Sequence, residues 1–138
     1  MNKSPIEELL EAVDTLNAKA AVALFLPQAR VLTVDGHRAE GSSAVGELLK
    51  VFFARLRSSA HRITAQWHLE NVWIAEVEAS YELRDWLQMN ALPRAFVLRT
   101  EQGEIADLRI YGANEQPLTD HRTGEEGMWV GTRWIPPL

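Results

Sequence analysis

The start of the chain, residues 4–27, repeats its apolar positions with the period of a helix. A capping box at Ser4 begins one helix, because its hydroxyl can accept a hydrogen bond from a free backbone amide of the first turn. Apolar residues then recur at helical spacing as far as Leu16. Asn17 can cap a second short helix over residues 18–25, which Pro27 closes. The segment therefore predicts a helical hairpin.

Between residues 29 and 56 the pattern changes from strand to helix. Residues 29–34 are rich in strand-forming side chains and lead into Asp35-Gly36, a pair typical of tight turns, after which residues 37–40 return as a short strand. Gly41 interrupts the pattern before residues 44–56, whose apolar side chains lie on one side of an amphipathic helix. We expect a short hairpin followed by a long helix.

The rest of the domain has the pattern of an antiparallel meander. The predicted strands are residues 62–69, 72–83, 93–100 and 104–111, with a turn at residues 101–103. In the second of these strands, apolar side chains alternate with glutamates and a serine, so one face of the sheet is expected to be dry and the other wet. Helices are expected to cover the dry face.

Composition limits the chain to one soluble domain. Its 138 residues are enough for a single hydrophobic core. Hydrophobic residues make up 46% and charged residues 24%, and no apolar run approaches the roughly 20 residues of a membrane helix. The start of the chain lacks the apolar stretch of a secretory signal, so we expect a cytoplasmic protein with no membrane partner.

Charge and residue usage argue against further classes. The net charge is −5 and the acidic groups are scattered, whereas a nucleic-acid surface needs a basic stripe, so no nucleic-acid partner is expected. The sequence has no cysteine, which excludes disulfides, zinc–thiolate sites and thiol nucleophiles. No group of His, Asp and Glu has the spacing of a metal site, and neither a metal nor another cofactor is expected.

The composition changes after residue 112, which divides the chain into a domain over residues 1–112 and a C-terminal extension over residues 113–138. The extension is polar and turn-rich at first and then becomes apolar around Trp129 and Trp134. A free tail does not favour two tryptophans. We therefore expect the extension to pack on the domain, on a partner subunit or at the mouth of a pocket.

The order of these elements resembles that of the nuclear transport factor 2-like superfamily over residues 4–112. The resemblance implies an α+β fold, a cone-shaped barrel whose strongly curved antiparallel or mixed sheet wraps around a long helix, with an N-terminal helical hairpin. It also implies a pocket for a small organic molecule at the wide end. Short phrases resemble the polyketide-cyclase-like (SnoaL-like) members in particular: residues 23–25, 34–36, 81–83, 103–105 and 109–111.

Function does not follow from this resemblance directly. The superfamily contains isomerases, dehydratases, cyclases and epoxide hydrolases, as well as members that catalyse nothing, so the activity has to be argued from the site. The ketosteroid isomerases of the superfamily use an Asp base, a Tyr and a protonated Asp. At the matching positions this sequence has Thr33, Ala12 and Arg94. Because these residues do not supply that chemistry, we exclude ketosteroid isomerase activity.

Dehydratases similar to scytalone dehydratase offer a closer pattern. They place a His at the start of the first long strand, which matches His61, and a second polar residue that falls near Asp85. A carboxylate beside a His fixes its tautomer and stabilises the imidazolium, so the pair would work as acid and base. Alternatively, His61 hydrogen-bonds backbone where the strand begins, and Asp85 belongs to a turn. The helper tyrosines of that enzyme have no clear match, and Thr33 and Asp35 occupy their neighbourhood.

Apolar and aromatic side chains are available to line a pocket, although most of them suit the core equally well. Arg94 faces the cavity if it shares the alternation of Phe96, and would then need a carboxylate or an anionic ligand; otherwise it lies at the solvent rim. The predicted substrate-binding residues are Thr33, Asp35, Phe52, Trp67, Tyr81, Arg94, Phe96, Leu108, Ile110, Trp129 and Trp134.

The sequence thus predicts a protein that binds a small apolar or aromatic molecule. In the leading hypothesis it is a cofactor-free lyase, isomerase or cyclase with His61 and Asp85 as acid and base. The rival is a non-catalytic ligand-binding or dimerisation module, and a purely structural dimer would fill its cavity with side chains such as those of the extension. The open sheet face, which begins at Trp73 and Ile74, is the expected homodimer surface.

Overall fold

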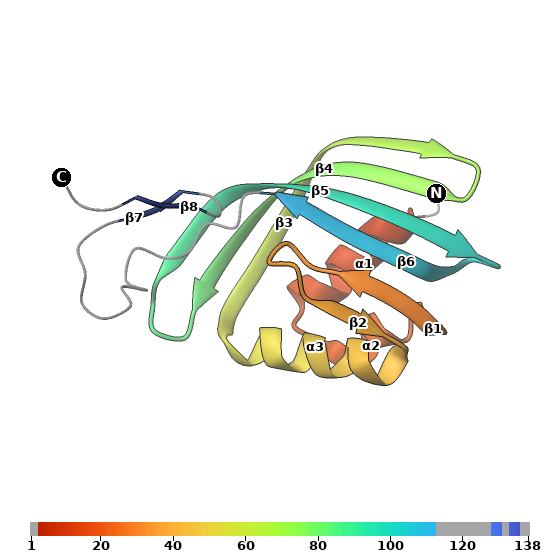
Figure 1. The fold of residues 1–138 in the computed structure, drawn as a ribbon, viewed down its shortest axis with the longest axis horizontal. Helices are drawn as coiled ribbons and strands as arrows, with labels where there is room; N and C mark the ends of the chain where they lie inside the picture. The colour runs from red at the N-terminus through yellow and green to blue at the C-terminus, as the bar shows by residue number, and fades with distance from the viewer. Residues whose placement is uncertain (1–2, 113–127, 131–132, 136–138) are drawn as a thin grey trace.

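The computed structural model describes residues 3–112, 128–130 and 133–135, and Figure 1 shows how their helices and strands are arranged. None of the helices in this part of the chain is both long and apolar enough to cross a membrane. In chain order the elements are α1 (Pro5–Asp14), α2 (Ala18–Val22), β1 (Phe25–Leu32), β2 (Arg38–Glu40), α3 (Ser42–Ala54), β3 (Leu56–Leu69), β4 (Val72–Leu83), β5 (Gln88–Glu101), β6 (Glu104–Gly112), β7 (Met128–Val130) and β8 (Arg133–Ile135).

A curved sheet of six strands in the order β2-β1-β6-β5-β4-β3 forms the body of the molecule (Figure 1). Every neighbouring pair is antiparallel except β1 and β6, which run parallel. The sheet is open, with β2 and β3 at its edges. The helices pack against one side of it and bury the apolar faces of both layers. The predicted α+β architecture with a strongly curved mixed sheet is therefore confirmed.

The N-terminal hairpin forms where its capping residues predict, but its second helix is shorter than expected. The Ser4 hydroxyl accepts a hydrogen bond from the Glu7 backbone amide at 3.1 Å, and Pro5 opens α1. The second helix ends at Val22 and not at Phe25, because Phe25 begins β1 opposite Ile105 of β6. Pairing with a strand some 80 residues further along the chain overrides the local helical pattern.

The alternation predicted for residues 72–83, which form β4, is confirmed, and it defines the inner face of the sheet. Ala75, Val77 and Ala79 of β4 are buried, whereas Glu76 between them is exposed. Strand pairing places Phe96 opposite Ala75, so the inner face continues into β5. The core lies between this face and the helices.

A bulge in β3 reverses the orientation of its second half, which corrects one prediction. The register shifts between Ile63, opposite Val77, and Ala65, opposite Glu76. One extra residue moves all following side chains to the other face. Trp67 therefore lies opposite Ile74 on the outer face, 52% exposed, and does not line the interior.

Two short strands of the C-terminal extension are described. They form a separate antiparallel pair in which Trp129 lies opposite Trp134. The side chains of both tryptophans, and all of residues 113–127, lie outside the described residues. The docking of the extension and the two-part division of the chain therefore stay predictions.

A candidate acid–base site

His61 is the centre of a cluster of polar side chains beneath the sheet. It lies inside β3 opposite Ala79, five residues after the strand begins, so the alternative in which it opens the strand is wrong. Its side chain is only 2% exposed. Nδ1 lies 2.6 Å from Oδ1 of Asp14, and Nε2 lies 3.0 Å from the hydroxyl of Tyr81. Both ring nitrogens are therefore engaged.

Asp14 fixes the orientation and the tautomer of this imidazole. Its Oδ1 also accepts from the Ser59 hydroxyl at 2.8 Å, and its Oδ2 accepts from the backbone amide of His61 at 2.9 Å. An ionised carboxylate only accepts hydrogen bonds, so Nδ1 of His61 carries the proton. Nε2 is then the acceptor for the Tyr81 hydroxyl. The result is a chain of donors running from Tyr81 through His61 to Asp14.

Aromatic rings pack around the hydrogen-bonded Tyr81 and His61. Phe52 of α3 meets Tyr81 edge to face with ring centroids 5.4 Å apart. His61 meets Tyr81 at 5.5 Å and Phe96 of β5 at 6.2 Å in the same manner. Edge-to-face geometry is the favoured arrangement of aromatic neighbours. Two predicted pocket residues thus adjoin the cluster, Phe52 beside Tyr81 and Phe96 beside His61.

Burial raises the pKa of the Tyr81 phenol to about 12, an effect that the positive charge of Arg94 reduces and the negative charge of Asp14 increases. Taking the phenolate out of water costs more than taking out the neutral phenol, which is why burial dominates. Tyr81 is therefore protonated at neutral pH. It can donate its proton only when a neighbouring base such as His61 accepts it.

Arg94 shares the inner face of the sheet with these aromatic residues. Strand pairing places it opposite Val77, a buried inner-face residue, and two positions before Phe96. Its Nη1 donates to the backbone oxygen of Pro93 at 2.9 Å, and the side chain is half-buried. Because β5 begins at Gln88, before Arg94, the alternation of Phe96 extends to Arg94.

Asp85 does not supply the carboxylate. It is exposed in the turn between β4 and β5, where its Oδ1 accepts from the Leu87 backbone amide at 3.1 Å. The predicted pair of His61 with Asp85 is replaced by the pair with Asp14, which lies 47 residues earlier in the chain. One signal pointed to Asp14. Asp14 is the last residue of α1. A negative charge at the C-terminal end of a helix interacts unfavourably with the helix dipole, so a carboxylate there indicates a role other than helix stability.

The remaining predicted residues have other environments. Thr33 donates to Asp35 and accepts from the backbone amide of His37, within the turn between β1 and β2. Leu108 is buried in the core opposite Leu98. Ile110 is half-buried on the inner face opposite Phe96. Ile110 therefore remains a candidate for ligand contact, whereas Leu108 serves packing.

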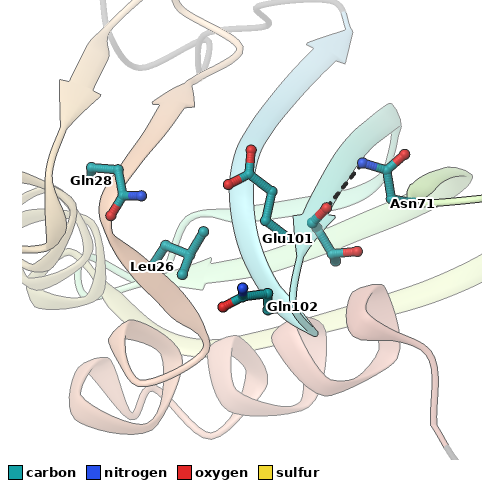
Figure 2. Close-up of a pocket in the computed structure, with 6 residues that line it drawn as sticks. Leu26, Gln28, Asn71, Glu101 and Gln102 are labelled. Atoms are coloured by element: carbon teal, nitrogen blue, oxygen red, sulfur yellow. Dashed lines mark hydrogen bonds between the residues drawn. The ribbon is translucent and has the colours of Figure 1, made fainter.

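A pocket of about 600 Å³ lies elsewhere, at the turns that join β3 to β4 and β5 to β6 (Figure 2). None of its lining residues belongs to the acid–base cluster, so it is not the predicted pocket. Asn71 there donates to the backbone oxygen of Thr100 at 3.1 Å and so ties the two turns together. The lining residues are Leu26, Gln28, Asn71, Thr100, Glu101 and Gln102.

The other two histidines within the described residues, His37 and His68, have partners outside the cluster. His68 stacks on Trp73 with ring centroids 3.5 Å apart. Trp73 lies opposite the fully buried Leu98 and packs against the core, so it does not belong to the open sheet face. His37 lies 3.3 Å from Asp35 in a turn. Within the described ranges, no three His, Asp or Glu side chains come together as a metal site would require.

Solved structures with the same arrangement identify the fold. A protein from Catenulispora acidiphila with a ketosteroid isomerase-like fold, solved in complex with trimethylamine, has a TM-score of 0.77 at 17% identity and covers 86% of this chain and 92% of its own. An uncharacterised nuclear transport factor 2-like protein from Burkholderia pseudomallei has a TM-score of 0.69 at 13% identity, covering 78% and 87%. The fold is that of the nuclear transport factor 2-like proteins.

Another structure with this nuclear transport factor 2-like fold is an LEH-like epoxide hydrolase from M. tuberculosis. It has a TM-score of 0.69 at 17% identity and covers 78% of this chain and 79% of its own. No protein-family model matches the sequence, and no curated protein sequence does either. At these identities the likeness extends to the fold, and the chemistry has to come from the residues of the site.

Proposed function

We propose that this protein is a cofactor-independent enzyme that transfers protons on a small apolar or aromatic molecule, in the manner of an isomerase, lyase or cyclase. The observation that carries the proposal is the buried His61, held by Asp14 at 2.6 Å on one side and by Tyr81 at 3.0 Å on the other. A general base must be oriented, and its conjugate acid must be stabilised. Asp14 does both.

The three residues form a proton relay. As the Tyr81 hydroxyl passes its proton to Nε2 of His61, its oxygen takes a proton from a C–H bond of the substrate. The electron pair of that bond stays on the substrate as an enolate. The imidazolium that results pairs with the carboxylate of Asp14. Returning the proton to a different atom completes an isomerisation, and returning it to a hydroxyl that leaves as water completes a dehydration.

The rival is a non-catalytic ligand-binding or dimerisation module of the same fold, and the outer sheet face supports the dimerisation part of it. The outer face of the sheet exposes large apolar side chains that a second copy of the chain could cover. Trp67 is 52% exposed, Tyr111 44% and Ile74 39%. Such a face suits a symmetric homodimer. Dimerisation is compatible with catalysis, so only an assay of proton transfer separates the two proposals.

Exchange of a carbon-bound proton provides that assay. The probe is 2-tetralone, an aromatic ketone with acidic C–H bonds next to its carbonyl, incubated with the protein in D2O and followed by proton NMR. We expect exchange above the buffer rate, reduced by about a hundredfold or more in His61→Gln and in Tyr81→Phe. Asp85→Asn is the matched control, because Asp85 occupies a turn and its substitution should leave the rate unchanged.

Circular dichroism melting curves show whether each variant still folds. Exchange at the buffer rate by folded wild-type protein would contradict the proposal, and binding of the ketone without exchange would support the module instead. Equal rates in the wild type and in His61→Gln would also contradict it, because the relay ends at His61. Loss of activity in Asp85→Asn alone would contradict the relay through Asp14 and would support the pair of His61 with Asp85 that the sequence predicted.

A further inference from the structure

We propose that Gln66 is a positioning residue for the acid–base site: by holding the start of α1 it sets where the helix ends, and so where the Asp14 carboxylate meets His61. Gln66 acts through α1, from the end of the helix opposite to Asp14. The effect on catalysis rests on the proposed function, whereas the effect on the geometry of the cluster does not.

Polar contacts hold α1 to β3 at both ends of the helix. At the C-terminal end, Asp14 accepts from the Ser59 hydroxyl and from the backbone amide and Nδ1 of His61. At the N-terminal end, the hydroxyl of the capping residue Ser4 donates to Oε1 of Gln66 at 2.6 Å. Ser4 is only 7% exposed, so water competes little for this bond. The helix therefore runs antiparallel to β3 and is attached to it at two points.

The two points of attachment are separated by nearly the same length on the helix and on the strand. Ser4 and Asp14 are ten residues apart, about 15 Å at the rise of an α-helix. His61 and Gln66 are five residues apart, about 16 Å at the rise of a strand. The next side chain on the same face of β3, His68, lies about 7 Å further along. The two contacts therefore fix the position of α1 along β3.

The bulge in β3 is what brings Gln66 to the inner face. Five residues after the inward-facing His61, the side chain of a regular strand would point outward. Gln66 nevertheless lies opposite the buried Ala75, on the inner face. Thr64 supplies the extra residue, and its hydroxyl donates to the backbone oxygen of Glu76 at 3.1 Å. The bulge thus presents the amide of Gln66 to the start of α1.

A small movement of the helix end would alter the site. Oδ1 of Asp14 lies 2.6 Å from Nδ1 of His61, and hydrogen bonds of this kind weaken beyond about 3.2 Å. A displacement of about 1 Å would therefore loosen the bond that orients the base. Misplacement of a reacting group by about that distance can lower a rate by about a hundredfold. Attachment of the far end of α1 limits such movement.

Hydrogen exchange of the His61 backbone amide measures the position of Asp14 without any substrate. This amide donates to Oδ2 of Asp14 at 2.9 Å, so its protection depends on the carboxylate. Gln66→Met keeps a long unbranched side chain and removes the amide group. In that variant, NMR should show the His61 amide exchanging about fivefold faster relative to the amides of β4, as the loss of one hydrogen bond predicts. A general loss of stability would accelerate both alike.

A conservative variant and a matched control define the cause. Gln66→Glu should restore part of the protection, because it keeps an acceptor for the Ser4 hydroxyl but places a second carboxylate beside Glu7. Gln88→Met should leave the exchange ratio unchanged. Gln88 also forms an amide hydrogen bond, to Glu82 at 3.3 Å, but this bond lies at the surface and does not involve α1.

A change on the other side of the same hydrogen bond keeps the test valid if Gln66→Met does not fold. Ser4→Gly removes the hydroxyl, and glycine is tolerated at a helix cap. It should accelerate exchange at His61 by a similar factor. The double variant should show no larger effect, because both substitutions remove one bond. An additive effect would overturn the inference.

Two further results in folded Gln66→Met would also overturn it. One is an unchanged exchange ratio, and the other is equal acceleration at His61 and throughout β4. Exchange of 2-tetralone separates this inference from the proposed function, since we expect its rate to fall about tenfold in Gln66→Met. If the wild type does not exchange 2-tetralone, the proposed function fails while the amide ratio still decides the positioning. A faster His61 amide with an unchanged 2-tetralone rate would overturn the role of Gln66 in catalysis.

Discussion

Replacing Tyr81 with Phe should change how the stability of the protein responds to alkaline pH. The phenol has a pKa of about 12 in the folded protein, against 10.0 as its ordinary value. Above pH 10 the unfolded chain therefore loses this proton while the folded protein keeps it. The unfolded state then binds fewer protons, so the free energy of unfolding falls as the pH rises from about 10 to about 12.

The size of this effect follows from the pKa difference. A difference of about two corresponds to about 3 kcal/mol over the whole range, and to about 1.4 kcal/mol at about pH 11. The Tyr81→Phe variant has no phenol at this position, so it lacks this part of the alkaline loss in the free energy of unfolding. The variant should be less stable than the wild type by about 1 kcal/mol at neutral pH, because it lacks the hydrogen bond to His61. The gap should close and then reverse as the pH rises through 11.

Urea unfolding curves, recorded for both proteins at intervals between neutral pH and about pH 11.5, measure this directly. Tyr111→Phe serves as the control, because Tyr111 is 44% exposed and lies outside the cluster. Parallel curves for the wild type and Tyr81→Phe across the alkaline range would refute the reasoning. They would mean that Tyr81 reaches water in the folded protein, and the case for a buried relay would fall with it.

Three further predictions concern other parts of the molecule. Asp14→Ala should lower the free energy of unfolding by about 2–4 kcal/mol, because three hydrogen bonds from Ser59 and His61 end on its carboxylate. Chemical denaturation measures this free energy. A loss no larger than that of Asp85→Ala would count against the cluster. Gln102→Asn should stabilise the protein by about 0.5 kcal/mol, because Gln102 has φ 52° before Gly103 at φ 82° and Asn-Gly is the favoured pair for such a turn; a lower melting temperature would show that the turn is of another kind. Ile74→Arg should weaken self-association in sedimentation velocity if the outer face forms the homodimer. Val51→Arg should not, because Val51 lies on α3 and not on that face, although it is 64% exposed against 39% for Ile74. A monomeric wild type would contradict the dimer.

Local sequence patterns predicted most of the helices and strands. The wrong predictions concern places where segments distant in the chain come into contact. The strand over residues 72–83 is found with those bounds, because its alternation is regular and turns flank it. The helix predicted for residues 44–56 is found at Ser42–Ala54. The second helix was predicted too long, since only pairing with β6 shows that Phe25 begins a strand. His61 could be selected from the sequence, but its partner could not.

What the sequence determined by itself is the order of the helices and strands and the presence of one dry sheet face. Capping residues, periodicity and turn pairs act over a few residues, so they can be recognised from the sequence without knowledge of the tertiary structure. Only the tertiary structure decided that Asp14 reaches His61 and that Trp67 faces outward. The first depends on how α1 packs under β3, and the second on a one-residue bulge that reverses a strand without a local signal, so neither could be deduced from neighbours in the chain.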